Sequence, residues 1–388
     1  MERSLYQSVT KLHRTGWVKE SMEVLEHKII SRKELEGLDV YKPGKPIEEV
    51  KRELGLNRII KLASNENPLG YSPMAKEAMI KEMEKLMFYP EGTAPVLVKK
   101  IAKQLKVKEE QVITGNGSDE ILRLLTRSYI RSGDEAIMAD VTFPRYETNV
   151  IIEGGRAIKV PLVNGVHDLG GMLAAITDKT RMIFVCNPNN PTGTIVGKRE
   201  LTSFINQVPN HILLVVDEAY FEYVTAEDHL DTVPLIHSHA NLIVLRTFSK
   251  IYGLAALRIG YGVMHSNFVK ELIKVKEPFN TNRMAQVAAT TSLADLEFVS
   301  KCKKENEKGR LYISAEVEKM GLSYFPSQGN FVMIRLNSSG DNVFQSLLHK
   351  GIIVRSGGVL GLPNTIRVSI GTKEENEAFI QALREVIQ

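Results

Sequence analysis

Lys250 is the residue of this sequence whose surroundings most favour covalent chemistry. It stands in a short polar turn directly after residues 241–246, an apolar run of β type. Ligands of open α/β sheets bind beyond the carboxyl ends of the strands, where a lysine can form a Schiff base with an aldehyde. Gly253 would let the following backbone pass close to such a ligand, and Arg258 adds a fixed positive charge suited to a phosphate. A lysine after a strand is most often a solvated surface residue, so this prediction needs partners from elsewhere in the chain.

A candidate phosphate site lies at residues 115–120, which follow a strand-like run, 111–114, and open a helix. The free N–H groups at the start of a helix, together with the helix dipole, bind phosphate without a charged side chain. Ser118 and Asp119 would supply these amides, although Ser or Asp at this place can equally be a simple helix cap. The segment lacks the third glycine of the GxGxxG pattern, so it is not a dinucleotide-binding fingerprint.

Three polar side chains that follow other buried runs suit a pyridine ring carrying a phenolic oxygen. Asn190, within residues 187–193, would donate a hydrogen bond to that oxygen, and Tyr220 could reach the same atom. Asp217 ends an apolar run and would keep the ring nitrogen protonated, so that the ring withdraws electrons from a substrate carbanion. Turn chemistry for Asn190 and a helix cap for Asp217 are the alternatives. Combined with Lys250, these residues predict pyridoxal 5'-phosphate as the cofactor.

An aromatic ring and two arginines complete the candidate site. Tyr146, in the segment 142–146, could lie flat against the cofactor ring, and we prefer it to Phe143; packing in the core is the alternative. Arg355 and Arg367 lie in or beside short β runs, which is an unusual place for arginine. They would bind an anionic group of the substrate, a phosphate or a carboxylate, and a structural ion pair is the alternative.

The order of apolar runs predicts an α/β fold. Strand-like runs alternate with helical or turn-rich stretches, which favours a mainly parallel, seven-stranded sheet covered by helices on both faces. We expect its strands near 111–114, 136–140, 156–160, 181–186, 211–216, 242–246 and 259–264. After about residue 285 a long charged helical stretch is followed by short strands near 322–325, 330–335, 352–355 and 365–370 and by helices near 342–350 and from 374. The second pattern is typical of a smaller α+β domain.

These patterns divide the chain into four parts. Residues 1–38 are expected to form a helical arm, with a candidate capping box at 31–34 before a second short helix. Residues 39–72 are expected to join the small domain, 73–284 to form the large cofactor-binding domain, and 285–388 to form the small α+β domain.

Composition argues against several classes of protein. The 388 residues carry a net charge of +4, and no apolar run approaches the about 20 residues needed to cross a bilayer. The amino-terminal residues lack the apolar core of a signal peptide, so we expect a cytoplasmic protein. Cys186 and Cys302 are too few for a disulfide framework and lack a zinc-binding arrangement, so no metal is expected. Basic and acidic residues are interspersed, which gives little support for nucleic-acid binding.

The order of the motifs resembles that of fold-type-I pyridoxal-phosphate aminotransferases, and among these the histidinol-phosphate aminotransferases. The matching segments, over about residues 38 to 388, are YKPGKPIEE, KLASNENPLG, FYPEG, GNGSDE, NPNNPTG, DEAY, SK with an arginine eight residues later, NFV and IRVSIGT. The resemblance implies a homodimer in which Tyr89 reaches the cofactor phosphate of the neighbouring subunit. It also implies that Ser249 and Arg258 join the phosphate site, and that Arg355 and Arg367 hold the phosphate or carboxylate of the substrate.

The same resemblance implies a two-stage transfer of an amino group, with Lys250, Asp217 and Tyr220 as the catalytic residues. Lys250 would hold the cofactor, be displaced by the substrate amine, and then move a proton between substrate and cofactor. The implied reaction interconverts histidinol phosphate and 2-oxoglutarate with imidazole-acetol phosphate and glutamate, in histidine biosynthesis. Transamination of aromatic amino acids and decarboxylation of threonine phosphate would use the same residues and stay open. A cofactor-binding transcription regulator is less favoured, because residues 1–38 are too short for a winged helix-turn-helix.

Overall fold

The computed structural model describes residues 30–40, 44–56 and 58–387. Its internal contacts divide the chain into two units, residues 1–40 and 41–388. In the first unit the described residues contain only a 3₁₀ turn, η1 (Lys33–Leu35), which begins after Arg32 without a side-chain cap. The capped short helix predicted after residue 31 is therefore wrong. The rest of the predicted arm, residues 1–29, lies outside the described residues.

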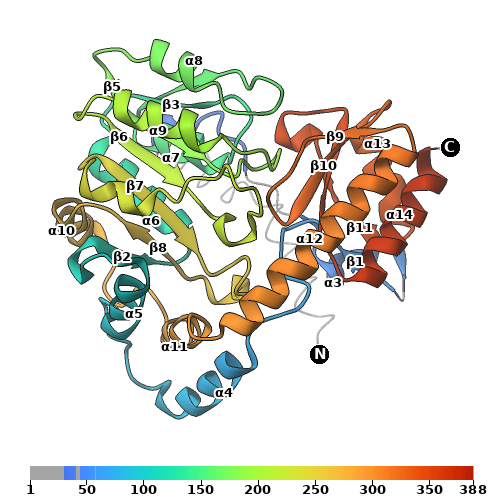
Figure 1. The fold of residues 1–388 in the computed structure, drawn as a ribbon, viewed down its shortest axis with the longest axis horizontal. Coiled ribbons are helices and arrows are strands. Elements are labelled where there is room, and N and C mark those ends of the chain that lie inside the picture. The colour runs from blue at the N-terminus through green and yellow to red at the C-terminus, as the bar shows by residue number, and fades with distance from the viewer. Residues whose placement is uncertain (1–29, 41–43, 57, 388) are drawn as a thin grey trace, which may run out of the picture. The chain divides into compact units, whose positions relative to one another are not determined.

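The largest sheet of the second unit has seven strands in the order β2-β8-β7-β6-β5-β3-β4 (Figure 1). These strands are β2 (Val112–Gly115), β3 (Glu135–Ala139), β4 (Arg156–Val160), β5 (Thr180–Cys186), β6 (Leu213–Asp217), β7 (Leu242–Thr247) and β8 (Gly260–Val263). Only β8 runs against its neighbours, since it pairs antiparallel with both β2 and β7. Parallel strands that are covered on both faces read as nearly continuous apolar runs, which is why the sequence revealed them. The predicted mainly parallel sheet is confirmed.

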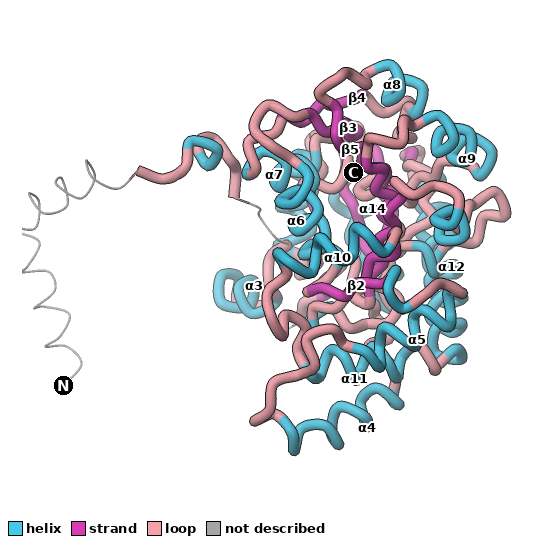
Figure 2. Tube along the Cα trace, turned by 90° about the vertical axis from the view of Figure 1, so that its left-hand side faces the viewer, coloured by secondary structure: helices cyan, strands magenta, loops and turns pink. Residues whose placement is uncertain are grey.

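Two groups of helices cover the two faces of this sheet. One core contains residues of α5 (Pro95–Leu105), α8 (Leu169–Ala174), α9 (Lys198–Gln207) and α11 (Arg283–Ser292), and the other contains residues of α6 (Ser118–Tyr129), α7 (Arg145–Ile152) and α10 (Ser266–Val275). Strand alternation separates the cores, because Ile183 and Val185 of β5 face the first and Met182 and Phe184 face the second. Figure 2 shows α6, α7 and α10 on one side of the strands and α5 and α9 on the other.

Two smaller sheets and four helices form a second group of elements in this unit. One sheet has the order β12-β13-β10-β9, and the other pairs β1 with β11. Their strands are β1 (Ile60–Lys61), β9 (Ser323–Tyr324), β10 (Phe331–Arg335), β11 (Ile352–Ile353), β12 (Arg355–Ser356) and β13 (Thr365–Ser369), and the helices are α3 (Ile47–Leu54), α12 (Leu296–Lys319), α13 (Gly340–His349) and α14 (Lys373–Ile387). The single strand predicted near 352–355 is thus split into β11 and β12. Because β1 pairs with β11, an early segment of the chain packs against a late one.

The remaining described elements are short or lie at the edge of the fold. One of them is α4 (Pro73–Glu82), which packs on α11 and continues into the 3₁₀ turn η2 (Met83–Lys85). The other 3₁₀ turns are η3 (Glu109–Gln111), η4 (Phe221–Tyr223), η5 (Val233–His237), η6 (Ala255–Leu257) and η7 (Gly358–Leu360). Among the described residues, no helix combines the length and the apolar character that a bilayer crossing requires.

Candidate active site

A cavity of about 430 Å³ lies beyond the carboxyl ends of β6 and β7. Ten residues predicted for the site line it: Ser118, Asp119, Asn190, Asp217, Tyr220, Ser249, Lys250, Arg258, Arg355 and Arg367. Two predicted residues, Tyr146 and Tyr89, do not line it. The structure therefore brings together groups that the chain separates by up to about 250 residues.

Lys250 projects into this cavity from the turn after β7. Its Nζ lies 3.5 Å from the carbonyl oxygen of Ser64 and 5.5 Å from the centre of the Tyr220 ring. Burial, with added repulsion from Arg367, lowers the pKa of Lys250 to about 8, although nearby carboxylates oppose the shift. A lysine with such a pKa is partly unprotonated near neutral pH, so it can act as a nucleophile.

A glycine is required at position 253 by the close approach of the backbone at Gly70, not by a ligand. Its φ is +69°, and a Cβ at this position would lie 1.8 Å from the carbonyl oxygen of Gly70. The glycine therefore lets the irregular segment before Gly70 pass against the turn that carries Lys250. That segment supplies Ser64 and Asn65 to the cavity wall.

Asp217 is a buried carboxylate at the end of β6. Its Oδ2 accepts a hydrogen bond from the Tyr146 hydroxyl at 2.8 Å, and its Oδ1 accepts one from the amide of Ala219 at 3.1 Å. Burial raises the pKa of Asp217 to about 6, and the Tyr146 hydrogen bond works against this rise. The helix-cap alternative does not hold, because the next helical element is the 3₁₀ turn η4, whose N-cap is Tyr220. A cationic group placed in the cavity beside this carboxylate would stabilise its ionised form.

The structure places Phe143, not Tyr146, on the wall of the cavity. Tyr146 is fully buried, and its ring stacks on Phe184 with ring centres 4.8 Å apart. It therefore lies behind Asp217 and holds that carboxylate by a hydrogen bond. The stacking role predicted for Tyr146 fits Phe143 better, since only Phe143 has a surface open to a ligand.

The start of α6 and the turn after β7 form one polar end of the cavity. Gly117 precedes α6 with a φ of +73°, and a Cβ there would lie 2.6 Å from Nη2 of Arg258. Arg258 also donates a hydrogen bond from Nη1 to Oγ of Ser249 at 3.2 Å, and its Nη2 lies 3.7 Å from Oδ2 of Asp119. Amides at a helix start, a hydroxyl and a guanidinium are together suited to a phosphate.

Hydrogen bonds orient Asn190 and Tyr220 on another wall of the cavity. Nη1 of Arg367 donates to Oδ1 of Asn190, which leaves the amide nitrogen of Asn190 as the donor toward a ligand. Nδ2 of Asn65 donates to the Tyr220 hydroxyl at 2.9 Å. Burial raises the pKa of Tyr220 above its ordinary value. Tyr220 is therefore a neutral hydroxyl that can donate a hydrogen bond into the cavity.

Arg355 and Arg367 are direct cross-strand partners on β12 and β13. Both side chains are buried, and Nη2 of Arg367 donates to the carbonyl oxygen of Ala63 at 2.9 Å. Like charges directly opposite each other in a sheet are unfavourable, so an anionic ligand between them would be stabilising. Arg145, which lines the same cavity, adds a further positive charge that the sequence analysis missed.

Other wall residues also escaped prediction, notably Ala63, Ser64 and Asn65. They belong to the segment KLASNENPLG, so the motif was recognised but no residue in it was assigned a role. Among the described residues, no group of three His, Cys, Asp or Glu side chains is placed to hold a metal ion.

Tyr89 lies away from the cavity of its own chain. It is 79% exposed, and its ring stacks on Phe279 with centres 4.8 Å apart. Arg283 fixes the backbone here by donating to the carbonyl oxygen of Tyr89 at 2.8 Å. An exposed ring held in this way is available to another molecule.

Comparison with known proteins agrees with this arrangement. Residues 57–383 match the family model for aminotransferase class I and II. The histidinol-phosphate aminotransferase of Geobacillus sp. (strain WCH70) is 50% identical over 355 residues, which cover 92% of this chain and 97% of that protein. The enzyme of the same name from Moorella thermoacetica (strain ATCC 39073 / JCM 9320) is 51% identical over 348 residues, covering 89% and 90%.

A solved structure extends the similarity to three dimensions. The crystal structure of histidinol-phosphate aminotransferase from Sinorhizobium meliloti in complex with pyridoxal-5'-phosphate has a TM-score of 0.85 and 28% identity, and the match covers 93% of this chain and 99% of that one. The fold, the cavity and these similarities agree. This chain belongs to the class I and II aminotransferase family, within the group of histidinol-phosphate aminotransferases.

Proposed function

We propose that the protein transfers an amino group between histidinol phosphate and 2-oxoglutarate, with pyridoxal 5'-phosphate as its cofactor. The other products are imidazole-acetol phosphate and glutamate. The observation that carries the proposal is a single cavity that combines a lysine of lowered pKa, a buried carboxylate and two paired arginines. The choice of substrate rests on the relatives, which are named histidinol-phosphate aminotransferases and are 50% and 51% identical to this chain over most of its length.

The residues of the cavity fit pyridoxal phosphate. The phosphate would be held by the amides of Ser118 and Asp119, the Ser249 hydroxyl and Arg258, where Gly117 leaves the space that a Cβ would fill. Asp217 would pair with the ring nitrogen, since a buried carboxylate of raised pKa favours a cationic partner. The amide of Asn190 and the hydroxyl of Tyr220 would donate to the phenolic oxygen, and Phe143 would lie against the ring.

Lys250 is the residue proposed to bond the cofactor and to move the proton. The bound cofactor supplies an electron-withdrawing ring that stabilises negative charge on the substrate carbon. Lys250 is suited to both tasks because its lowered pKa lets it lose and regain a proton near neutral pH. The Tyr220 ring beside Nζ limits the directions in which this side chain can move.

Arg355 and Arg367 are proposed to hold the phosphate of histidinol phosphate and, in the second half of the reaction, a carboxylate of 2-oxoglutarate. Both ligands carry an anionic group that a pair of guanidinium groups can bind with several hydrogen bonds. One arginine pair could therefore serve two substrates in turn.

A homodimer is proposed to complete the site. Residues 83–89 expose a group of large apolar side chains: Met83, Leu86, Met87, Phe88 and Tyr89. A cluster of this kind is typical of an interface with another protein chain. We propose that a second copy covers it, and that Tyr89 then reaches the cofactor phosphate of the neighbouring subunit. Tyr89→Phe should lower cofactor affinity, and sedimentation should give twice the mass of one chain.

The division of the chain is likewise a proposal. We propose a large cofactor-binding domain at 73–284 and a small domain from 39–72 and 285–388; the β1–β11 pairing supports the second assignment. Residues 1–38 would be a separate arm. We also propose a cytoplasmic location, consistent with two free, buried cysteines.

Half-reactions test the substrate. We expect histidinol phosphate to discharge the visible absorbance of the lysine-bound cofactor at least about tenfold faster, per unit concentration, than phenylalanine. Threonine phosphate should release no carbon dioxide. A faster reaction with phenylalanine would favour an aromatic aminotransferase, and carbon dioxide from threonine phosphate would favour a decarboxylase.

A further inference from the structure

The arginine pair on β12 and β13 accounts for only one of the two branches that each proposed substrate carries at its reacting carbon. Histidinol phosphate has a phosphate on one branch and an imidazole ring on the other. 2-Oxoglutarate has a carboxylate on each branch. If the pair binds the phosphate and, in its place, the carboxylate next to the keto carbon, the distal carboxylate of 2-oxoglutarate still needs a partner. A carboxylate taken out of water without a partner is costly, so the site should supply a further cation.

Arg145 is a further cation on the wall of the active cavity. It is the first residue of α7 and is half-buried. The loop before it is fixed, because Oγ1 of Thr142 donates to Oδ1 of Asn189 at 2.8 Å. The residue after it is also fixed, because Tyr146 lies in the core and donates to Asp217. The backbone of Arg145 is therefore held on both sides, while its long side chain can adjust to a ligand.

No hydrogen bond or ion pair joins the side chain of Arg145 to another residue that the structure describes. Glu147, two positions further along α7, pairs instead with Lys159 at 2.8 Å. Arg258 on the wall of the same cavity does have a carboxylate nearby, since its Nη2 lies 3.7 Å from Oδ2 of Asp119. The guanidinium of Arg145 is thus available to an anionic ligand, which it could bind through two parallel hydrogen bonds.

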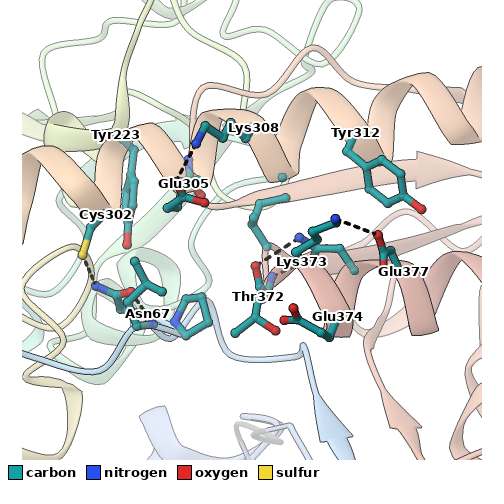
Figure 3. A pocket seen from close by; sticks show the side chains of 17 residues that line it. Asn67, Tyr223, Cys302, Glu305, Lys308, Tyr312, Thr372, Lys373, Glu374 and Glu377 are labelled. Carbon is teal, nitrogen blue, oxygen red and sulfur yellow. Dashed lines mark hydrogen bonds and ion pairs between the residues drawn. The ribbon is translucent and has the colours of Figure 1, made fainter.

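A second cavity shows the opposite treatment of cations on a cavity wall. It has a volume of about 580 Å³ and is bounded by α12 and by the start of α14 (Figure 3). Nζ of Lys308 lies 2.7 Å from Oε1 of Glu305. Nζ of Lys373 lies 3.8 Å from Oε1 of Glu377. The lysines of this second cavity are neutralised by the chain itself, whereas the charge of Arg145 is left for a ligand.

We propose that Arg145 binds the distal carboxylate of 2-oxoglutarate and thereby determines which amino-group acceptor the protein uses. This inference rests on the proposed function, in which Lys250, Asp217 and Arg258 are engaged with the cofactor. Three guanidinium groups then line the space for the substrate, and this positive charge favours a dianion. A planar guanidinium also stacks on aromatic rings, so the imidazole of histidinol phosphate can occupy the same place in the other half-reaction.

Binding of two unreactive acids to the holoenzyme tests the assignment without turnover. Glutarate is the five-carbon diacid that lacks the keto group, and pentanoate has the same chain length with one carboxylate. Isothermal titration calorimetry of the wild type should show roughly 10- to 100-fold tighter binding of glutarate, the range expected for a charge-assisted hydrogen bond. Arg145→Gln should remove most of this preference, and Arg145→Lys, which keeps the charge, should retain most of it. Arg199→Gln is the matched control, because it makes the same change near the start of α9 and outside the active cavity.

Half-reactions separate this inference from the proposed donor. Arg145→Gln should slow the reaction of the aminated enzyme with 2-oxoglutarate roughly 10- to 100-fold per unit concentration. It should slow the reaction with histidinol phosphate less than about fivefold, because only a stacking contact is lost. A wild type that reacts with 2-oxoglutarate but not with histidinol phosphate would contradict the proposed donor alone.

Three outcomes would overturn the role of Arg145. The first is wild-type protein that binds glutarate no more tightly than pentanoate, and this result needs no variant. The second is an Arg145→Gln variant that keeps the preference for glutarate. The third is an equal loss in both half-reactions of that variant, because a residue that only supports the fold would affect both substrates alike.

Discussion

The two sheets that border the active cavity contribute groups of different electrostatic kinds. The seven-stranded sheet places Lys250 and Asp217, two titratable groups whose pKa values burial moves toward neutrality. The four-stranded sheet places Arg355 and Arg367, whose charge is fixed and which lie directly opposite each other. Groups whose pKa values lie near neutral pH can exchange protons, whereas a fixed positive charge can only hold an anion. We therefore propose that the seven-stranded sheet supplies the groups that make bonds and that the four-stranded sheet supplies the groups that bind the substrate.

The paired arginines of the four-stranded sheet also act on the titratable lysine of the other sheet. Two guanidinium groups at adjacent positions repel each other, and part of that repulsion reaches Lys250, whose pKa Arg367 helps to lower. Arg367 thus favours the unprotonated form of Lys250 before any ligand arrives. Substitutions on the two sheets should separate these effects.

Replacing Lys250 with alanine should have the largest effect. We expect kcat with histidinol phosphate to fall by roughly 10⁴-fold or more, because among the described residues no other lysine lines the cavity to bond the cofactor or move the proton. Single-turnover kinetics followed by the loss of cofactor absorbance would measure it. Normal turnover by this variant would show that the seven-stranded sheet does not supply the group that bonds the cofactor.

Asp217→Asn should have the next largest effect. The amide keeps an acceptor for the Tyr146 hydroxyl but loses the charge that would pair with the ring nitrogen, so we expect kcat to fall by roughly 100- to 1000-fold. Tyr146→Phe is the matched control, because it removes the hydrogen bond and keeps the carboxylate. It should cost about tenfold or less. Equal losses in the two variants would mean that the hydrogen bond, rather than the charge, matters.

Arg367→Lys and Arg355→Lys should act on binding rather than on chemistry. Each keeps the charge but loses the forked donor geometry, so we expect KM for histidinol phosphate to rise roughly 10- to 100-fold while kcat changes less. Steady-state kinetics with both substrates would check this. Arg123→Lys, on the exposed side of α6, is the control. A loss confined to kcat would contradict the division between the sheets.

The sequence predicted the seven-stranded sheet better than the position of each side chain around it. Buried parallel strands are long apolar runs, and their polar carboxyl ends, such as Asp217 and the turn with Lys250, could be recognised directly. Tyr146 and Phe143 could not be told apart in this way. Which ring faces the cavity depends on α7 beginning at Arg145, and this turns Tyr146 into the core.

Contacts between distant segments were also beyond sequence reasoning. Asn65 reaches the cavity because the backbone of Gly70 packs on Gly253, and because the backbone N–H of Asn65 donates to Oγ of Ser369, 304 positions away. No local pattern encodes such a pairing, so the motif around Asn65 carried no assigned role. The role of Tyr89 is even harder to predict from a local pattern, because its proposed partner belongs to another chain.

The smallest expected effect tests whether the two sheets are coupled. Lys250 would react with the cofactor aldehyde only as a free amine, so the rate of cofactor rebinding to the apoenzyme should rise with pH and level off above about 8. An ordinary lysine would level off more than two units higher. Arg367→Gln removes a charge that disfavours protonated Lys250, so the pKa of Lys250 should rise and the rebinding curve should move to higher pH. Stopped-flow absorbance across pH 6 to 10 would record both curves. If they coincide, burial alone sets the reactivity of Lys250, and the four-stranded sheet contributes only binding.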